Sequence, residues 1–353
     1  MSHTDFLRSA FPALADRLPR TDLAILPTPL DERPVDFAGS HRTLYVKRDD
    51  LTSGLYGGNK VRKLEYLFAR AGQRDATRIA TFGAAGSNHA RATAIFAKAA
   101  GFECTAFLSH QAKTPQVAAT LNRHIKIGTE LVSYGGTYAR RIGTLRRHLQ
   151  GRRAWVIPMG GSSWLGTVGF VAAGLELAAD FDGRTALMPK RLYVATGTMG
   201  TAVGIALGLA LARVDVEVQA VRVSDVSIMN QAAMERLLGN TVLMMRRLDP
   251  TLPADLAQRA SIRVRDDFFG PGYAKGTEAT DEAIAFGHDE LGLDLEVTYT
   301  GKAMAALLAD WRDRGNRNAL YWHTYNSAPL GVPADRPLDA NALPPEFLRY
   351  FGD

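Results

Sequence analysis

A lysine that follows two glycines is the first residue in this sequence placed to do covalent chemistry. Lys60 comes after Gly57-Gly58-Asn59 and opens a segment with apolar residues at helical spacing. Paired glycines permit a tight turn, and the start of a helix is suited to anions. Partial burial there would lower the pKa of the lysine and make its amine nucleophilic. From spacing alone, a solvated lysine behind a loop is the simpler interpretation.

Small and polar residues follow the predicted strand at 78–82, in the order Gly83-Ala84-Ala85-Gly86-Ser87-Asn88-His89. Such a strand-to-helix loop offers backbone N–H groups to a carboxylate, and Ser87 adds a hydroxyl. Ser87 or Asn88 could equally cap the next helix, and both interpretations can hold. No His, Cys or carboxylate lies at matching spacing from His89, so we expect no metal site.

A turn rich in glycine and threonine follows a later predicted strand, as Thr196-Gly197-Thr198-Met199-Gly200-Thr201. Its amides, its hydroxyls and the helix dipole would converge on a phosphate. No acidic residue ends the next strand as a dinucleotide site requires, so a monophosphate fits better. The alternative is a tight turn that serves only helix packing.

Two tyrosines and a histidine stand where later strands or loops meet helices or turns. Phenols at such positions can act in acid–base catalysis, although each alone is more often a packed aromatic. We expect the histidine to be a core residue with satisfied nitrogens rather than a ligand. The segments are Gly270-Pro271-Gly272-Tyr273, Tyr299-Thr300-Gly301-Lys302 and His323-Thr324.

Short apolar runs alternate with amphipathic segments from residue 43 to residue 324, which predicts parallel sheets covered by helices on both faces. Ligands of such folds bind at the carboxyl ends of strands. Residues 1–42 are expected to be an irregular lead-in with short helices, and residues 239–276 an excursion that returns through a functional loop. The predicted strands are 43–48, 78–82, 103–108, 129–134, 154–158, 191–196, 216–223 and 318–324. The predicted helices are the segment after Lys60 and 88–100, 114–126, 137–149, 166–180, 200–213, 277–291 and 301–314.

Bulk properties limit the class of protein. The 353 residues are enough for about two domains, and the net charge of +6 comes from dispersed basic residues, which argues against a nucleic-acid partner. No apolar run is long enough for a membrane span, and the first residues do not read as a secretory signal. The single cysteine, Cys104, allows no intrachain disulfide and favours the cytoplasm. Its apolar surroundings predict a buried strand rather than a nucleophile.

All four groups occur in order between about Pro27 and Thr324, and together they carry a family resemblance. The segments VKRDDLTSGLYGGNKVRKLEYL and GSNHAR are close to signatures of the D-cysteine desulfhydrase / 1-aminocyclopropane-1-carboxylate (ACC) deaminase family. The chain resembles these fold-type II pyridoxal 5′-phosphate (PLP) enzymes over nearly its whole length. The resemblance implies an α/β fold similar to tryptophan synthase β, with two open, twisted, mostly parallel sheets flanked by helices. It also implies a homodimer with a large PLP-binding domain (1–60 and 167–353) and a small domain (61–166).

The resemblance implies that one set of residues binds PLP. Lys60 would form the Schiff base, and Lys63 would lie near the phosphate in the turn Thr196–Thr201. Asn88 would face the O3′ oxygen of the cofactor, and Thr324 matches a threonine in the family's closing His-Thr stretch.

A second set would bind the small amino-acid substrate and act on it. Ser87 would hold the substrate carboxylate, with Asn88 and His89 of the same loop. Tyr273 and Tyr299 match the two active-site tyrosines of the family, which can protonate or position the leaving group.

Thr300 is also expected to contact the cofactor. Its residue type distinguishes the ACC deaminases from the β-eliminating lyases of the family. ACC deaminases carry a glutamate there, and a carboxylate near the pyridine nitrogen strengthens the electron sink that ring opening needs. A neutral threonine suits β-elimination, in which a good leaving group departs early. The sequence departs from the family at Tyr325-Asn326, where relatives usually have Gly-Gly, and at 83–86, where they often have a glutamine before the serine. Both departures bear on the identity of the substrate.

The sequence therefore predicts a cytoplasmic PLP-dependent lyase that converts D-cysteine, or another small β-substituted amino acid, to pyruvate, ammonia and the leaving group. Lys60 is the preferred base for the α-proton, with a tyrosine or His89 as substitutes. The alternatives are an ACC deaminase, a lyase for another β-substituted alanine such as cysteate, and a PLP-binding racemase or non-catalytic homologue. A nucleotide- or sugar-phosphate-binding protein without PLP is a further class.

Overall fold

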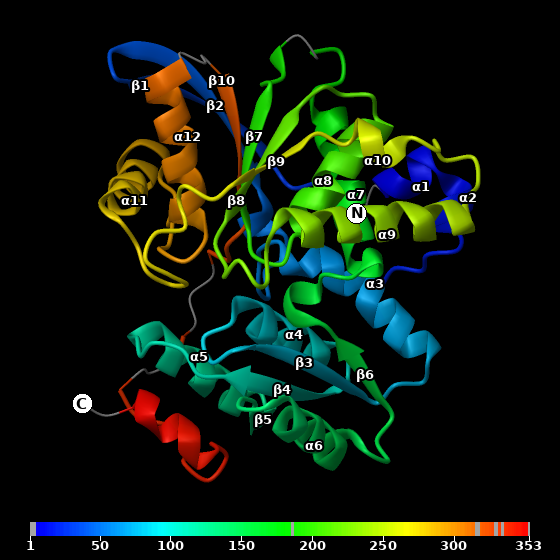
Figure 1. Cartoon of the computed structure of the whole chain (residues 1–353), viewed down its shortest axis with the longest axis vertical. Helices are drawn as coiled ribbons and strands as arrows, with labels where there is room; N and C mark the ends of the chain where they lie inside the picture. The colour runs from blue at the N-terminus through cyan, green and yellow to red at the C-terminus, as the bar shows by residue number, and fades with distance from the viewer. Residues whose placement is uncertain (1–4, 185–186, 315–317, 328–330, 333–334, 352–353) are drawn as a thin grey trace. The chain divides into compact units, whose positions relative to one another are not determined.

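The computed structural model describes residues 5–184, 187–314, 318–327, 331–332 and 335–351. The chain forms two compact units (Figure 1). The larger unit comprises Met1–Pro19, Ala24–Tyr66 and Ser162–Ser327, and the smaller unit comprises Arg20–Leu23, Leu67–Gly161 and Ala328–Asp353. Within the described ranges, no helix is long and apolar enough to cross a membrane.

The larger unit is built on a six-stranded sheet in the order β1-β2-β10-β7-β8-β9. β1 runs antiparallel to β2, and each of the other neighbouring pairs is parallel. The carboxyl ends of the parallel strands therefore meet at one edge, where His323 pairs with Arg48 and Thr196 with Arg222. This is the edge at which such sheets bind ligands. The strands are β1 (Leu30–Phe37), β2 (Ser40–Arg48), β7 (Arg191–Thr196), β8 (Glu217–Arg222), β9 (Ile262–Arg265) and β10 (Asn318–His323).

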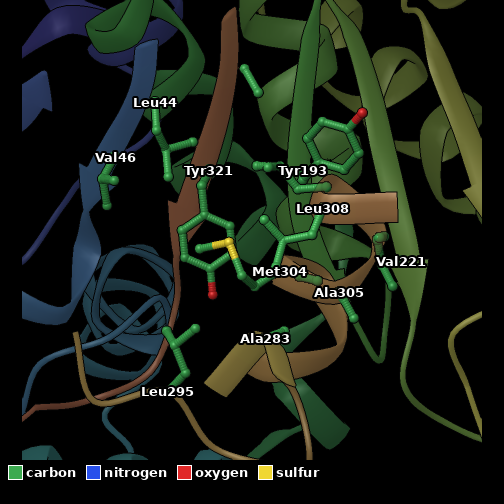
Figure 2. Packing of buried hydrophobic residues seen from close by; sticks show 14 of the residues in the cluster. Leu44, Val46, Tyr193, Val221, Ala283, Leu295, Met304, Ala305, Leu308 and Tyr321 are labelled. Carbon is green, nitrogen blue, oxygen red and sulfur yellow. The ribbon is translucent and has the colours of Figure 1, made fainter. Parts of the chain in front are cut away.

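Helices cover both faces of this sheet because successive strand residues point to opposite sides. Tyr321 of β10 packs in one core with α11 and α12, and Figure 2 shows it beside Met304 of α12. Its neighbours Leu320 and Trp322 pack in a second core with α7 and α8. The helices of this unit are α1 (Phe6–Ala10), α2 (Pro12–Ala15), α7 (Trp164–Asp180), α8 (Gly200–Leu211), α9 (Gln231–Leu248), α10 (Leu256–Arg259), α11 (Glu278–Leu291) and α12 (Thr300–Arg314).

Buried charges fix the start of α3 (Lys60–Gln73) on the larger unit. A Cβ at Gly169 of α7 would lie 2.1 Å from Arg62 O, so the two helices meet backbone to backbone. The Arg62 guanidinium pairs with Asp49 and Glu176, both at 2.8 Å, and Lys47 pairs with Glu176 at 2.7 Å. Removing one partner of such a buried pair costs about 3–5 kcal/mol because the other charge is left alone. These motif residues therefore position the start of α3.

The smaller unit has a four-stranded parallel sheet in the order β5-β4-β3-β6. Cys104 is buried on β4, as predicted. The short helix η4 (Pro345–Tyr350) near the C-terminus packs Phe347 and Tyr350 into a core with Leu108 and Val117. The other elements of this unit are β3 (Arg78–Ala84), β4 (Glu103–Ser109), β5 (Glu130–Ser133), β6 (Ala154–Ile157), α4 (Asn88–Ala99), α5 (Pro115–Lys126), α6 (Tyr138–Leu149) and the 3-10 turn η2 (Met159–Gly161); a further 3-10 turn, η1 (Asp49–Leu51), belongs to the larger unit.

The predicted α/β fold with two mostly parallel sheets is confirmed. The expectation of an irregular lead-in over residues 1–42 is wrong at β1, because an edge strand paired on one side tolerates Pro34 and a run of charges. The expected excursion at 239–276 contains two regular elements that the sequence did not indicate, the second half of α9 and the strand β9. α9 continues through Gly239 because Met234 and Met245 pack inward, and β9 extends the sheet.

Candidate active site

Lys60 is the first residue of α3 and follows the tight turn Gly57–Asn59. Its Nζ donates a hydrogen bond to Asn59 Oδ1 at 2.9 Å, and Asn59 Nδ2 donates to Thr201 Oγ1 at 3.0 Å. Burial lowers the pKa of Lys60 to about 8. At pH 7 about a tenth of such an amine is unprotonated, compared with well under a thousandth for an exposed lysine. The residue expected to be nucleophilic therefore has the environment that this role needs.

Three polar side chains converge on Gly200, the first residue of α8. A Cβ at this position would lie 2.7 Å from Ser162 Oγ, 3.0 Å from Lys63 Nζ and 3.1 Å from Thr167 Oγ1. Thr167 Oγ1 is buried and has no hydrogen-bond partner within the described part of the chain. Burial, reinforced by the charge of Lys60, holds the pKa of Lys63 well below its ordinary value. An anion bound here would stabilise the ammonium and give the Thr167 hydroxyl an acceptor.

The turn that leads into α8 has the geometry of an anion-binding loop. Met199 has φ +67° and precedes α8 without a side-chain cap of its own, and the first amide of the helix, Gly200 N–H, donates to Ser162 Oγ at 3.2 Å. Thr198 Oγ1 lies 2.8 Å from Ser162 Oγ and so belongs to the same polar group. Thr196 differs, because its hydroxyl donates to Val194 O at 3.1 Å and turns back toward the strand. Backbone amides and Thr198 are therefore the main donors of this turn.

The two tyrosines singled out in the sequence form a hydrogen-bonded pair. Tyr273 lies in the loop before α11, and Tyr299 directly precedes α12; their hydroxyl oxygens are 2.6 Å apart. The rings cross at 81°. Burial raises the pKa of Tyr273 to about 12, and burial together with the neighbouring phenol raises the pKa of Tyr299 well above its ordinary value. Both phenols are therefore protonated at neutral pH, which suits proton donation and disfavours either as a base.

A buried lysine holds the loop that carries Tyr273. Lys302 is fully buried on α12, and its Nζ donates to Phe269 O at 2.6 Å and to Gly272 O at 3.0 Å. Its ammonium also lies 5.0 Å from the centre of the Phe269 ring. Burial lowers the pKa of Lys302 to about 8. These carbonyls lie four residues and one residue before Tyr273. The ammonium therefore restrains the loop from which Tyr273 reaches Tyr299.

A carboxylate lies beside Thr300, although residue 300 itself is neutral. Glu296 accepts the N–H groups of Tyr299 at 2.7 Å and Thr300 at 2.9 Å, and so caps α12. Thr300 Oγ1 is 3.3 Å from the same carboxylate and accepts the Glu296 N–H at 2.8 Å. The Thr300 carbonyl accepts from the Tyr321 hydroxyl at 2.9 Å. The neutral environment expected at this position is thus modified by a charge four residues earlier.

The carboxyl end of β10 joins this group of residues. Thr324 is buried, and its carbonyl accepts the Asn59 N–H at 3.0 Å. His323 is buried as expected, but the expectation of satisfied nitrogens is wrong: neither ring nitrogen has a hydrogen-bond partner among the residues that the structure describes. Its Nε2 lies 3.9 Å from Asp50 Oδ2, and burial lowers the pKa of His323 to about 4. The imidazole is therefore neutral at physiological pH.

Ser87 begins α4 in the smaller unit. Its Oγ accepts the Ala90 N–H at 3.2 Å, which confirms the capping interpretation and uses the acceptor side of the hydroxyl. A Cβ at Gly83 would lie 2.4 Å from Ser87 Oγ, so the strand-to-helix turn requires a glycine at that position. The turn therefore presents the start of α4 with its serine in a fixed orientation.

The next two residues of α4 are oriented by neighbours in the same unit. Asn88 Oδ1 accepts from Arg91 Nη2 at 3.2 Å, which turns its amide nitrogen away from Arg91. The His89 ring nitrogens lie 3.0 Å from Thr81 Oγ1 and 3.5 Å from Thr93 Oγ1. Hydroxyl contacts at both ring nitrogens make His89 a poor candidate for the base.

Residues 21–320 match the protein family described as pyridoxal-phosphate dependent enzyme. The chain belongs to this family. Its cofactor is pyridoxal 5′-phosphate. The D-cysteine desulfhydrases of Salmonella paratyphi B and Salmonella enteritidis are each 36% identical over 307 residues, which cover 83% of this chain and 88% of theirs.

Solved structures of PLP enzymes share the fold. An ACC deaminase homologue matches with a TM-score of 0.72 and 28% identity, covering 92% of this chain and 95% of the homologue. An L-serine ammonia-lyase from Rhizomucor miehei matches with a TM-score of 0.60 and 16% identity, covering 86% of this chain and 95% of the lyase. At that identity the second match shows the fold alone.

The residues of this PLP-dependent enzyme fit the cofactor. The space at Gly200 that a Cβ would fill is lined by an ammonium and hydroxyls, including the unpartnered Thr167 oxygen, which suits a phosphate. Lys60 supplies an amine with a lowered pKa, and Asn59 connects it to the same turn. The larger unit thus brings the predicted lysine and the predicted phosphate turn together.

The sequence motifs missed several residues of this group. Ser162, Thr167 and Glu296 belong to no motif, and Asn59 and Lys302 lie inside motifs without an assigned role. Two serines before a helix indicate only a cap, and a threonine inside an apolar helix indicates only packing. Their contribution depends on which helix lies against α8 or α12, which the local pattern does not specify.

Proposed function

We propose that this enzyme catalyses α,β-elimination on D-cysteine, releasing sulfide, pyruvate and ammonia with the uptake of one water. The observation that carries the proposal is the half-buried Lys60, with its pKa lowered to about 8, joined through Asn59 to an anion-binding turn. The two D-cysteine desulfhydrases that are 36% identical to the chain support the substrate. Bound PLP supplies the electron sink that stabilises charge at the α-carbon.

Lys60 is proposed to hold the cofactor and then to take the α-proton. A substrate amine that displaces it leaves a primary amine whose lowered pKa makes it a competent base near neutral pH. Lys63, Thr198 and the amides that open α8 are proposed to bind the phosphate, with Ser162 and Thr167 as further donors. An anion bound at Gly200 would also stabilise the ammonium group of the neighbouring Lys63.

Ser87 and Asn88 are proposed to recognise the other end of the ligand. The Ser87 hydroxyl and the amides that open α4 bind the substrate carboxylate, because helix starts favour anions. Asn88 would face the O3′ oxygen of the cofactor, as the family resemblance implies. His89 completes this loop as a positioning residue, held by threonine hydroxyls on both ring nitrogens.

The phenol pair is proposed to protonate the leaving group. Elimination breaks the Cα–H and Cβ–S bonds, forms a carbon–carbon double bond, and expels a thiolate that needs a proton. Tyr273 and Tyr299 are both neutral and share one short hydrogen bond, so one can donate while the other stabilises the resulting charge. The unsaturated amine that is released hydrolyses in water to pyruvate and ammonia.

Thr300 and Thr324 are proposed to face the pyridine ring of the cofactor. A hydroxyl at position 300 favours elimination of a good leaving group, although the Glu296 carboxylate at 3.3 Å brings a charge near. The structural match to an ACC deaminase homologue makes ring opening of ACC the second candidate. The two differ in the product, because ACC yields a four-carbon keto acid without sulfide.

We also propose that the enzyme works in the cytoplasm as a homodimer. Cys104 is the single cysteine, so the chain forms no intrachain disulfide, which suits a reducing compartment. Dimers are common among the enzymes that the chain resembles. Light scattering of the purified holoenzyme measures the assembly directly, and a monomer at micromolar concentration contradicts it.

A substrate panel tests the proposed reaction. The PLP-loaded enzyme is incubated with D- and L-cysteine, D-cysteate, D-serine, β-chloro-D-alanine and ACC, and keto acid and sulfide are measured. We expect pyruvate and sulfide in equal amounts from D-cysteine at the highest kcat/KM of the panel. Keto acid from ACC alone selects the second candidate, and racemisation without keto acid refutes both.

A further inference from the structure

Asn326 holds the turn before Lys60 through its side chain. Its Oδ1 accepts the Gly57 N–H at 2.8 Å, across 269 positions of sequence. Asn326 is 5% exposed, so water does not compete for this donor. The residue lies three positions after the end of β10 and two positions after Thr324.

The other two amides of the turn donate to backbone oxygens. Gly58 N–H donates to Asp49 O at 2.8 Å, and Asn59 N–H donates to Thr324 O at 3.0 Å. Backbone acceptors are present whatever side chains the sequence carries. The acceptor for Gly57 exists only because residue 326 has a side-chain oxygen of this length.

The two glycines make the turn both tight and intrinsically free. A Cβ at Gly57 would lie 1.9 Å from Asp50 O, and one at Gly58 would lie 2.8 Å from Thr324 O. Gly58 also has φ +97°, which disfavours any other residue. A backbone that must be glycine twice has the largest conformational freedom to lose, so each hydrogen bond that restricts it counts.

From these contacts we infer that Asn326 is a positioning residue for Lys60. It fixes the first amide of the turn, the turn fixes Asn59, and Asn59 joins the Lys60 amine to Thr201 of the phosphate turn. The inference rests on the proposed role of Lys60 as the cofactor-binding lysine. According to this inference, the affinity for PLP and the protonation of Lys60 depend partly on Asn326, a side chain that contacts neither substrate nor cofactor.

Two substitutions of similar shape isolate the acceptor. Asn326→Leu removes the acceptor oxygen, whereas Asn326→Asp keeps it. Both variants lack the amide NH₂ group, so the loss of its contacts is the same in each. Ser327→Ala is the matched control, because Ser327 Oγ donates to Asp50 Oδ2 at 2.8 Å in the same segment without reaching the turn. Each apoprotein is titrated with PLP, and its visible absorbance is followed against pH.

We expect Asn326→Leu to weaken PLP binding about tenfold, since a buried N–H is left unpaired, and to shift the pH at which the absorbance changes. Asn326→Asp should stay within threefold of wild type, and Ser327→Ala should bind PLP as wild type does. Wild-type PLP affinity and pH response in Asn326→Leu overturn the inference, as does an equal loss in Asn326→Asp. If the leucine variant does not fold, Asn326→Ala carries the same test. No readout uses a substrate, so failure of the substrate panel and failure here are distinguishable.

Discussion

The space at Gly200 offers a direct test of where the cofactor phosphate binds. Gly200→Ala adds one methyl group at the point where three polar atoms converge, 2.7 Å from Ser162 Oγ, 3.0 Å from Lys63 Nζ and 3.1 Å from Thr167 Oγ1. These distances are shorter than the ~3.5 Å of an ordinary non-bonded contact. The methyl group therefore displaces the side chains from one another or occupies the place of a phosphate oxygen.

The expected loss follows from the number of contacts at risk. A hydrogen bond to a charged group contributes about 1.5–3 kcal/mol. Loss of one phosphate contact thus costs about 1.5–3 kcal/mol, which weakens PLP binding by roughly 10- to 150-fold, and loss of a second contact weakens it further. Folding changes less, because alanine is favoured over glycine in a helix by about 1 kcal/mol and offsets part of the crowding.

A second glycine supplies the matched control. Gly239 lies in α9, and a Cβ there meets no atom within 4 Å. Gly239→Ala should raise the free energy of unfolding by about 0.5–1 kcal/mol and leave PLP affinity unchanged. Helix propensity and phosphate contact are thereby measured separately.

The assay for both variants is a titration of the apoprotein with PLP, followed by absorbance, and a urea unfolding curve. Inorganic phosphate is added as a competitor, because a phosphate site should be blocked by it in the wild type and less so in Gly200→Ala. A folded Gly200→Ala variant that binds PLP within threefold of wild type refutes the phosphate assignment.

Four further outcomes are expected. Lys60→Ala should abolish the visible absorbance of covalently bound cofactor and nearly all turnover; wild-type turnover contradicts the lysine assignment. The rate at which apoprotein incorporates PLP should rise with pH and level off above about 8, since the amine must be neutral to attack and burial lowers the pKa of Lys60 to about 8; a rise that continues to pH 10 indicates an ordinary lysine. Lys302→Met leaves the carbonyls of Phe269 and Gly272 unpaired, and should lower both kcat, about tenfold, and the urea midpoint; a change in the midpoint alone makes the residue purely structural. Thr300→Glu should add keto-acid release from ACC, and loss of PLP binding without that product contradicts the interpretation of position 300.

The alternation of apolar runs and amphipathic segments was sufficient to predict the parallel sheets. Strands such as β7 and β10 are buried on both faces, so their sequences are continuously apolar and easy to recognise. β1 was not predicted, because an edge strand with Pro34 and several charges has no continuous apolar pattern. α9 was not predicted, because Gly239 and Asn240 interrupt the helical sequence pattern, and the stability of this helix comes from packing.

Residue type and local spacing singled out the side chains to which the proposed function assigns covalent and hydrogen bonds. Lys60 after two glycines, the turn of glycine and threonine after β7, and the two tyrosines were all found without coordinates. These groups are recognisable because each requires a particular backbone conformation at the start of a helix. The glycines and small polar residues beside them indicate that conformation.

Tertiary structure decided how those groups are tuned. Burial sets the pKa of Lys60, and only packing brings Ser162, which precedes α7, and Thr167 of α7 to Gly200 of α8. The same holds for Asn326, whose oxygen reaches Gly57 from the far end of the chain. Sequence patterns extend over a few residues, whereas desolvation and these hydrogen bonds depend on elements that are distant in sequence and adjacent in space.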